Sequence, residues 1–189
     1  MANVDAAFGF RPVRHYFGGL VRANRYEIAT TYSTSLFTGD PVKSTGTTKQ
    51  IEIAAVSSPI LGVFAGCRYV NSAGDLIYSR YWPASTVLKS GTVADAFVFD
   101  DPFILYEAQM SGSLAVTDLA QTADFVAGTG DTATGISRYE VNSTGIGTGE
   151  GVVLVDYKRD PDNAIGTTNT KVLVMLSEHE FRPAAIVGV

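Results

Sequence analysis

The sequence predicts an all-β protein, built as a β-barrel or a β-sandwich, and three observations support this expectation. Short runs of β-branched and aromatic residues recur along the 189-residue chain, and several alternate between large and polar side chains. Turn-forming sequences, among them Asn71-Ser72-Ala73-Gly74-Asp75, separate these runs. Hydrophobic residues make up 46% of the chain and charged residues 17%, a balance that supports a buried core and excludes intrinsic disorder.

The alternation of large and polar side chains predicts where the strands lie. In residues 76–81, for example, large and polar side chains take turns, as in a strand with one buried face. On the same grounds the predicted strands are residues 25–29, 51–55, 61–70, 76–82, 96–99, 103–109, 152–157 and 171–176. Short strands at this spacing are typical of a sandwich or a barrel.

One stretch departs from this pattern and predicts a short helix at residues 117–127. Its apolar residues recur at helical spacing, Thr117 is a suitable N-cap, and Gly128 is a suitable stop. Residues 128–151, rich in glycine and threonine, are then expected to form a long loop with one short strand. The residues that anchor this loop are Ile136, Tyr139 and Val141.

The first 24 residues are predicted to form an extended N-terminal arm on a β-rich domain of residues 25–189. The formal net charge is −5, but residues 6–26 hold four arginines and no acid, whereas residues 91–150 hold nine acids against Arg138 alone. Arginines next to aromatic residues are typical of protein interfaces. The candidate interface residues are Phe8, Phe10, Arg11, Arg14, Tyr16, Phe17, Arg22 and Arg25. The alternative is that this segment packs on its own domain.

The sequence offers few candidate residues for catalysis, nucleotide binding or metal binding. Cys67, the single cysteine, lies in an apolar run where burial would make it inert. Residues 130–137 have phosphate-loop spacing but carry Ile136 in place of the lysine. Glu178-His179-Glu180 resembles a metal half-site, yet strand neighbours point to opposite faces. We therefore expect no enzyme, cofactor or metal site.

Acidic residues suggest two further kinds of site, a glycosidase pair and a calcium site, and we expect neither. Asp100 and Asp101 could form a glycosidase pair, although adjacent acids before a proline more often cap a turn. Asp160, Asp162 and Asn163 could contact calcium, but the residues that follow do not continue a calcium loop.

Several segments together resemble a family of tailed-bacteriophage head decoration proteins, also called capsid cement proteins. They occur in the same order across nearly the whole chain. The segments are Ala6-Ala7-Phe8-Gly9-Phe10-Arg11-Pro12-Val13-Arg14-His15, Thr38-Gly39-Asp40-Pro41-Val42, Leu61-Gly62-Val63-Phe64-Ala65-Gly66, Trp82-Pro83 leading to Asp100-Asp101-Pro102, Gly128-Thr129-Gly130 through Gly135, Arg159-Asp160-Pro161-Asp162-Asn163, and residues 172–176 with Glu178-His179.

The resemblance implies an all-β virion protein on the outer surface of the capsid, made in the host cytoplasm. Its implied partners are the major capsid protein and itself, as a homotrimer or homodimer at a local symmetry axis, and it implies no active site. Net acidity and the lack of a long apolar run argue against nucleic-acid and membrane binding. The apolar residues 184–189 are expected to join a sheet. The alternative function is a carbohydrate-binding module in which Tyr78, Tyr81 and Trp82 stack on sugars.

Overall fold

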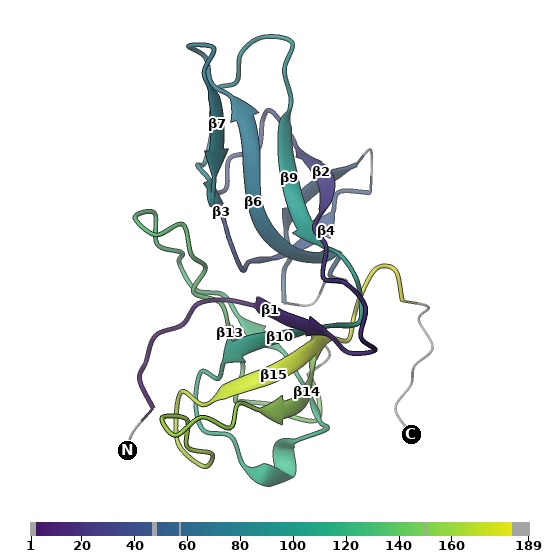
Figure 1. Cartoon of the computed structure of the whole chain (residues 1–189), viewed down its shortest axis with the longest axis vertical. Helices are drawn as coiled ribbons and strands as arrows, with labels where there is room; N and C mark the ends of the chain where they lie inside the picture. The colour runs from purple at the N-terminus through teal and green to yellow at the C-terminus, as the bar shows by residue number, and fades with distance from the viewer. Residues whose placement is uncertain (1–2, 47–48, 57, 150, 183–189) are drawn as a thin grey trace.

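The computed structural model describes residues 3–46, 49–56, 58–149 and 151–182, and their regular secondary structure is almost entirely β-strand, as predicted. Two lobes follow one another along the longest axis of the protein, with a barrel in one and an open sheet in the other (Figure 1). The strands are β1 (Arg11–His15), β2 (Asn24–Ile28), β3 (Leu36–Phe37), β4 (Pro41–Ser44), β5 (Gln50–Ile53), β6 (Gly62–Val70), β7 (Leu76–Ser79), β8 (Tyr81–Trp82), β9 (Ala94–Phe99), β10 (Ile104–Gln109), β11 (Thr122–Ala123), β12 (Phe125–Val126), β13 (Glu140–Val141), β14 (Val152–Tyr157) and β15 (Lys171–Leu176).

The barrel lobe is a closed ring of five strands in the order β4-β5-β2-β9-β6, and β4 pairs with β6 to close it. β2 and β5 run parallel, while the other pairs are antiparallel. β7 continues the sheet beyond β6, and no strand of the described residues pairs with its other side. Closure removes open edges, so β7 is the only strand of this sheet with a free edge among the described residues. Trp82 and Phe64 are among the fully buried residues of this core.

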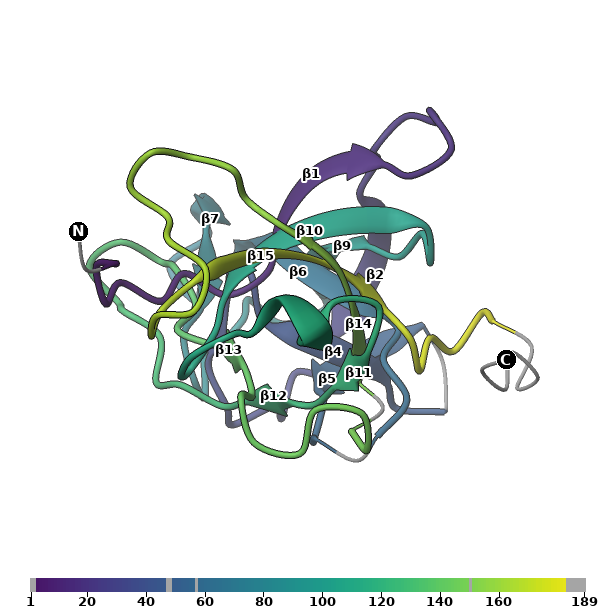
Figure 2. The ribbon, with the colours of Figure 1, turned by 90° about the horizontal axis from the view of Figure 1, so that it is seen from below.

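The second lobe is an open antiparallel sheet in the order β1-β10-β15-β14-β11. β15 alternates inward and outward, so Val172, Val174 and Leu176 are buried while the residues between them are partly exposed. Phe10, just before β1, completes this core with edge-to-face contacts to the rings of Tyr106 and Phe125. β1 forms one outer edge of the sheet (Figure 2).

The two lobes meet where residues 36–40 contact both halves of the chain. The Thr38 amide donates to the Gly135 carbonyl at 3.0 Å, and the Phe10 amide donates to the Gly39 carbonyl at 2.9 Å. Gly39 has φ +102°, and a Cβ there would lie 3.0 Å from the Phe8 carbonyl oxygen. The junction therefore requires glycine at this position.

The expected helix at 117–127 is wrong. The structure has a single 3₁₀ turn, Val116–Asp118, followed by the two short strands β11 and β12. Ala120 has φ +67°, which ends any helix, and Val116 is 65% exposed. The buried residues are Ala123 and Phe125, with Asp124 between them, so the two-residue period of a strand prevails. The expected loop at 128–151 with one short strand is confirmed for its described residues by β13.

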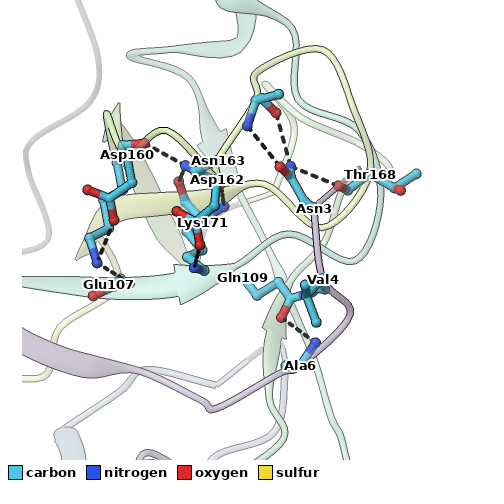
Figure 3. A network of polar contacts seen from close by, with 12 residues as sticks. Asn3, Val4, Ala6, Glu107, Gln109, Asp160, Asp162, Asn163, Thr168 and Lys171 are labelled. Atoms are coloured by element: carbon cyan, nitrogen blue, oxygen red, sulfur yellow. Dashed lines mark hydrogen bonds and ion pairs between the residues drawn. The ribbon is translucent and has the colours of Figure 1, made fainter. Parts of the chain in front are cut away.

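The segment predicted as an arm is described from Asn3 onward, and it is attached to the open sheet as far as His15. The Asn3 side chain donates to the carbonyls of Ala164 and Thr168, both at 3.0 Å, as Figure 3 shows in part. Gln109 accepts from the Ala6 amide at 3.1 Å and donates to the Val4 carbonyl at 3.3 Å. Residues 184–189, which we expected to join a sheet, lie outside the described residues.

Candidate binding interface

The end of β1, the loop that follows it and the turn before β10 together form a surface that we call the aromatic tip: His15, Tyr16, Phe17, Leu20 and Phe103. It projects from the body of the protein (Figure 2). His15 organises its backbone, because Nδ1 accepts from the amides of Phe17 at 3.2 Å and Gly19 at 3.0 Å. The ring proton is then on Nε2, which lies 3.3 Å from a carboxylate oxygen of Asp101.

The rings of the aromatic tip pack against one another but stay open to solvent. Phe17 lies 5.1 Å from both Tyr16 and Phe103, edge to face, measured between ring centroids. Yet Phe17 is 70% exposed and Leu20 is 80% exposed. Large apolar side chains held together in solvent are typical of a surface that binds a partner.

Arginines surround this surface. The Arg14 guanidinium lies 6.0 Å from the Tyr16 ring, and the Arg182 guanidinium lies 5.3 Å from the Phe103 ring. Arg14 and Arg22 form no ion pair with any acid in the described ranges, and the same holds for Arg11 on β1. Their charges are therefore available to a partner.

The tip rests on a turn, residues 100–103, that is anchored in the barrel. Asp100 accepts from the Asn24 amide group at 2.8 Å and from the Tyr26 hydroxyl at 2.6 Å. Burial and the Asp100 carboxylate raise the pKa of Tyr26. Asp101 accepts from the Phe103 amide at 2.9 Å. The two aspartates therefore stabilise the turn on which the tip rests, as the capping interpretation expected.

The structure brings together only part of the predicted interface set. Arg14, Tyr16 and Phe17 lie on or beside the aromatic tip, and Arg22 lies further along the loop between β1 and β2. Phe8 and Arg11 form a separate cation–π pair at 4.4 Å.

Two members of the predicted set have internal roles. Phe10 is 1% exposed in the sheet core. Arg25 pairs with Asp95 at 2.6 Å, beside an Arg68–Asp95 pair on the barrel. Sequence reasoning missed Leu20, Phe103 and Arg182. The last two reach the tip only through the fold, and Leu20 is marked in the sequence solely as an apolar residue between two glycines and Val21.

The residues considered for chemistry have structural roles here. Cys67 is buried, its thiol donates to the Tyr81 carbonyl at 3.4 Å, and burial raises its pKa to about 12. Asp160 and Asp162 pair with Lys158 and Lys171, at 3.0 and 3.5 Å (Figure 3). Asn163 bonds the backbone of Lys158 and Lys171 instead of facing the two aspartates. The calcium interpretation therefore has no converging ligands.

His179 is buried between the lobes. Its Nδ1 accepts from the Phe181 amide at 3.1 Å. Burial, with a smaller contribution from the Arg182 cation, lowers its pKa to about 4. Over the described residues there is no group of three or more His, Cys, Asp or Glu side chains that could hold a metal ion.

The aromatic residues considered for sugar stacking are mostly engaged within the protein. Trp82 is fully buried, and the Tyr81 ring stacks on Phe37 with 5.5 Å between centroids. Tyr78, at 68% exposed, is left as the single open ring of the three.

Comparison of the chain with protein-family models, curated proteins and solved structures found no match. A search of the described residues for a helix long and apolar enough to cross a bilayer also found none.

Proposed function

We propose that this chain is a structural virion protein that binds the outer surface of a tailed-phage capsid and links neighbouring major capsid protein subunits. The observation that carries the proposal is the aromatic tip, an exposed surface of packed aromatic rings next to Arg14, which forms no ion pair with an acid among the described residues. The ordered segments that resemble capsid decoration proteins supply the identity of the partner.

The physical task of such a protein agrees with what the surface offers. A ligand that binds the assembled shell better than free subunits stabilises the shell by mass action. This task requires contact area and anchor residues, and exposed aromatic and arginine side chains are the residue types that dominate binding energy at interfaces. The acidic net charge of −5 suits an outer surface, away from packaged DNA.

The test is co-sedimentation of the purified protein with undecorated phage heads. The wild-type protein should pellet with heads and saturate. Phe17→Ala should weaken binding roughly 10- to 30-fold, as for an interface anchor residue. Val116→Ala is the matched control, since Val116 is 65% exposed in the same lobe but lies outside the tip, and it should bind like wild type.

Two results would contradict the proposal. One is a wild-type protein that ignores heads at all accessible concentrations. The other is a glycan array that binds the protein in the absence of capsids and loses binding on Tyr78→Ala, which would establish the carbohydrate-binding alternative.

A further inference from the structure

His15 holds the loop after β1 through a single atom of its side chain. Nδ1 accepts from two backbone amides at once, those of Phe17 at 3.2 Å and Gly19 at 3.0 Å. The loop lies so close to the ring that a Cβ at Gly19 would be 3.0 Å from both Cγ and Nδ1 of His15. The loop is therefore folded onto the edge of the imidazole that carries Nδ1.

The backbone makes few other hydrogen bonds in this loop. The Tyr16 amide donates to the Phe103 carbonyl at 2.8 Å, and the Gly18 amide donates to the His15 carbonyl at 3.2 Å. Among the described residues, the Phe17 amide has no acceptor except Nδ1 of His15. The contact of the Phe17 ring with Phe103, at 5.1 Å between centroids, thus depends on an unprotonated Nδ1.

The other ring nitrogen of His15 is held independently of the loop. Nε2 carries the ring proton and lies 3.3 Å from one carboxylate oxygen of Asp101. The other oxygen of Asp101 accepts from the Phe103 amide at 2.9 Å, which fixes the carboxylate. A second proton on the ring makes an imidazolium, and a carboxylate attracts an imidazolium more strongly than a neutral ring. Asp101 therefore keeps the ring in place in both charge states.

Protonation of Nδ1 removes the acceptor on which the loop depends. The new N–H points at the amides of Phe17 and Gly19, which are donors themselves, so both hydrogen bonds are lost. Because Asp101 holds the ring in either charge state, the proton distinguishes the held loop from the released loop only at Nδ1. It binds the released loop better, and acid shifts the population toward that state.

From this geometry we propose that His15 is a proton-sensitive switch of the aromatic tip. At neutral pH it holds Phe17 against Phe103, and in mild acid it releases residues 17–19, so that the tip loses its affinity for its partner. The inference rests on the proposed function and supplies the regulation of the same surface. The switch itself is a property of the free protein and can be measured without a partner.

The charged groups near His15 do not replace the acceptor at Nδ1. Asp101 is on the side of Nε2, and Asp100 beside it is held from the barrel. Arg14 precedes His15 on β1, and Arg182 donates to a carbonyl of the turn at 3.3 Å. β10 places an uncharged residue opposite His15. In the described structure, none of these groups bonds Nδ1.

Two other buried groups bear on a titration between pH 8 and pH 5, the range in which histidine ordinarily changes charge. His179, the only other histidine, stays neutral there because burial lowers its pKa to about 4. Burial raises the pKa of Asp40 to about 6, so this residue does titrate in the range. Asp40 lies at the junction of the lobes, where it accepts from the Phe37 amide at 2.8 Å. Asp40→Asn is therefore the control for a charge change outside the tip.

The experiment is nuclear magnetic resonance of the full chain from pH 8 to pH 5, without heads. At pH 8 the His15 ring should be neutral with Nδ1 unprotonated, and the rings of Phe17 and Phe103 should show a nuclear Overhauser contact. As Nδ1 gains its proton, the population with this contact should fall roughly tenfold, because two hydrogen bonds are lost. The contact between the core rings of Phe10 and Tyr106 should persist, which verifies that the sheet stays folded.

Substitutions at His15 separate the proton from the hydrogen bonds. His15→Asn supplies a side-chain oxygen that does not titrate and can accept from the amide two residues ahead, as Asn142 does from Thr144 at 2.9 Å. This variant should keep the contact between Phe17 and Phe103 at both pH values. His15→Ala has no acceptor and should lack the contact at both. Asp40→Asn should respond to pH like wild type.

Head binding at the two pH values tests the regulation. Wild-type protein should bind undecorated heads about tenfold more weakly at pH 5 than at pH 8, whereas His15→Asn should bind equally at both. Three results would overturn the inference: a contact between Phe17 and Phe103 that persists when Nδ1 is protonated, one that is lost equally in His15→Asn, or equal head binding by wild type at both pH values. Protein that shows the switch but ignores heads at every pH contradicts the proposed function alone.

Discussion

The two lobes use β-structure in different ways. The barrel lobe closes on itself, so its strands pair with one another around the ring. Its core is built from a continuous stretch of the chain between Asn24 and Phe99. The sheet lobe is open and takes its strands from both ends of the described chain, with β10 between β1 and β15. The closed lobe supplies a rigid support, and the open lobe carries the aromatic tip at the end of its outer strand. Architecture and candidate function are thus divided between them.

The largest expected effect tests whether the lobes are one cooperative unit. Phe10 lies in the sheet core, whereas Trp82, the single tryptophan, lies in the barrel. Phe10→Ala should cost about 3–5 kcal/mol because it removes a fully buried ring. The junction hydrogen bonds should transmit this loss, so the urea midpoint followed by Trp82 fluorescence should fall. An unchanged Trp82 transition would mean that the lobes unfold independently.

The second effect concerns two buried titratable groups where the lobes meet. Burial raises the pKa of Asp40 to about 6, against the opposing contributions of the Ser137 hydroxyl and the Phe37 amide. Because its folded pKa is above the unfolded value, Asp40 contributes stability at pH 4 that is lost as the pH rises through 6. His179, with its pKa lowered to about 4, contributes stability above pH 6.5 that is lost as the pH falls through 4.

These two contributions oppose each other, and each is worth about 3 kcal/mol. Between pH 7 and pH 4, the free energy of unfolding of Asp40→Asn should therefore fall by about 3 kcal/mol relative to that of wild type. His179→Gln should change in the opposite direction, gaining stability toward pH 4. Urea denaturation at pH 4, 5, 6 and 7 measures both. If the pH dependence of the free energy of unfolding changes in the same direction in both variants, the burial assigned to Asp40 and His179 is wrong.

The smallest expected effect is a difference in stability between removing an arginine that has no acidic partner and removing one that pairs with a buried acid. Arg14→Ala should change stability by less than about 0.5 kcal/mol, since Arg14 has no acidic partner in the described structure. Arg25→Ala should cost about 1 kcal/mol, because the buried Asp95 loses one of its two cations. Thermal unfolding compares them, and equal losses would remove the distinction.

The barrel was largely predictable from the sequence, and the sheet lobe less so. The predicted strands 25–29, 51–55 and 61–70 correspond to β2, β5 and β6, because their local alternation is strong. β3 and β4 were not predicted, because both strands are short. β1 was assigned to an arm because its proline and arginines do not resemble a strand, and only pairing with β10 orders it. The helix error arose because helical spacing selected Val116, Ala120 and Val126, which are exposed, whereas the buried residues are Ala123 and Phe125 at strand spacing.

The candidate site was half predictable for a similar reason. Tyr16 and Phe17 are neighbours in a basic, aromatic segment, so composition revealed them. Phe103 reaches the same surface from the distant turn before β10, and composition carries no signal for that contact. Phe10 matched the composition equally well but is buried, since composition cannot tell which face of the chain packs inward.

The central claim is that the aromatic tip is the surface that contacts the capsid. Hydroxyl-radical footprinting of the protein, free and bound to heads, tests it most directly by measuring side-chain oxidation residue by residue. Oxidation of Tyr16 and Phe17 should fall at least about fivefold on binding, as expected for buried interface anchors, while Val116 should be oxidised equally in both states. Full oxidation of Tyr16 and Phe17 in the head-bound protein would contradict the account.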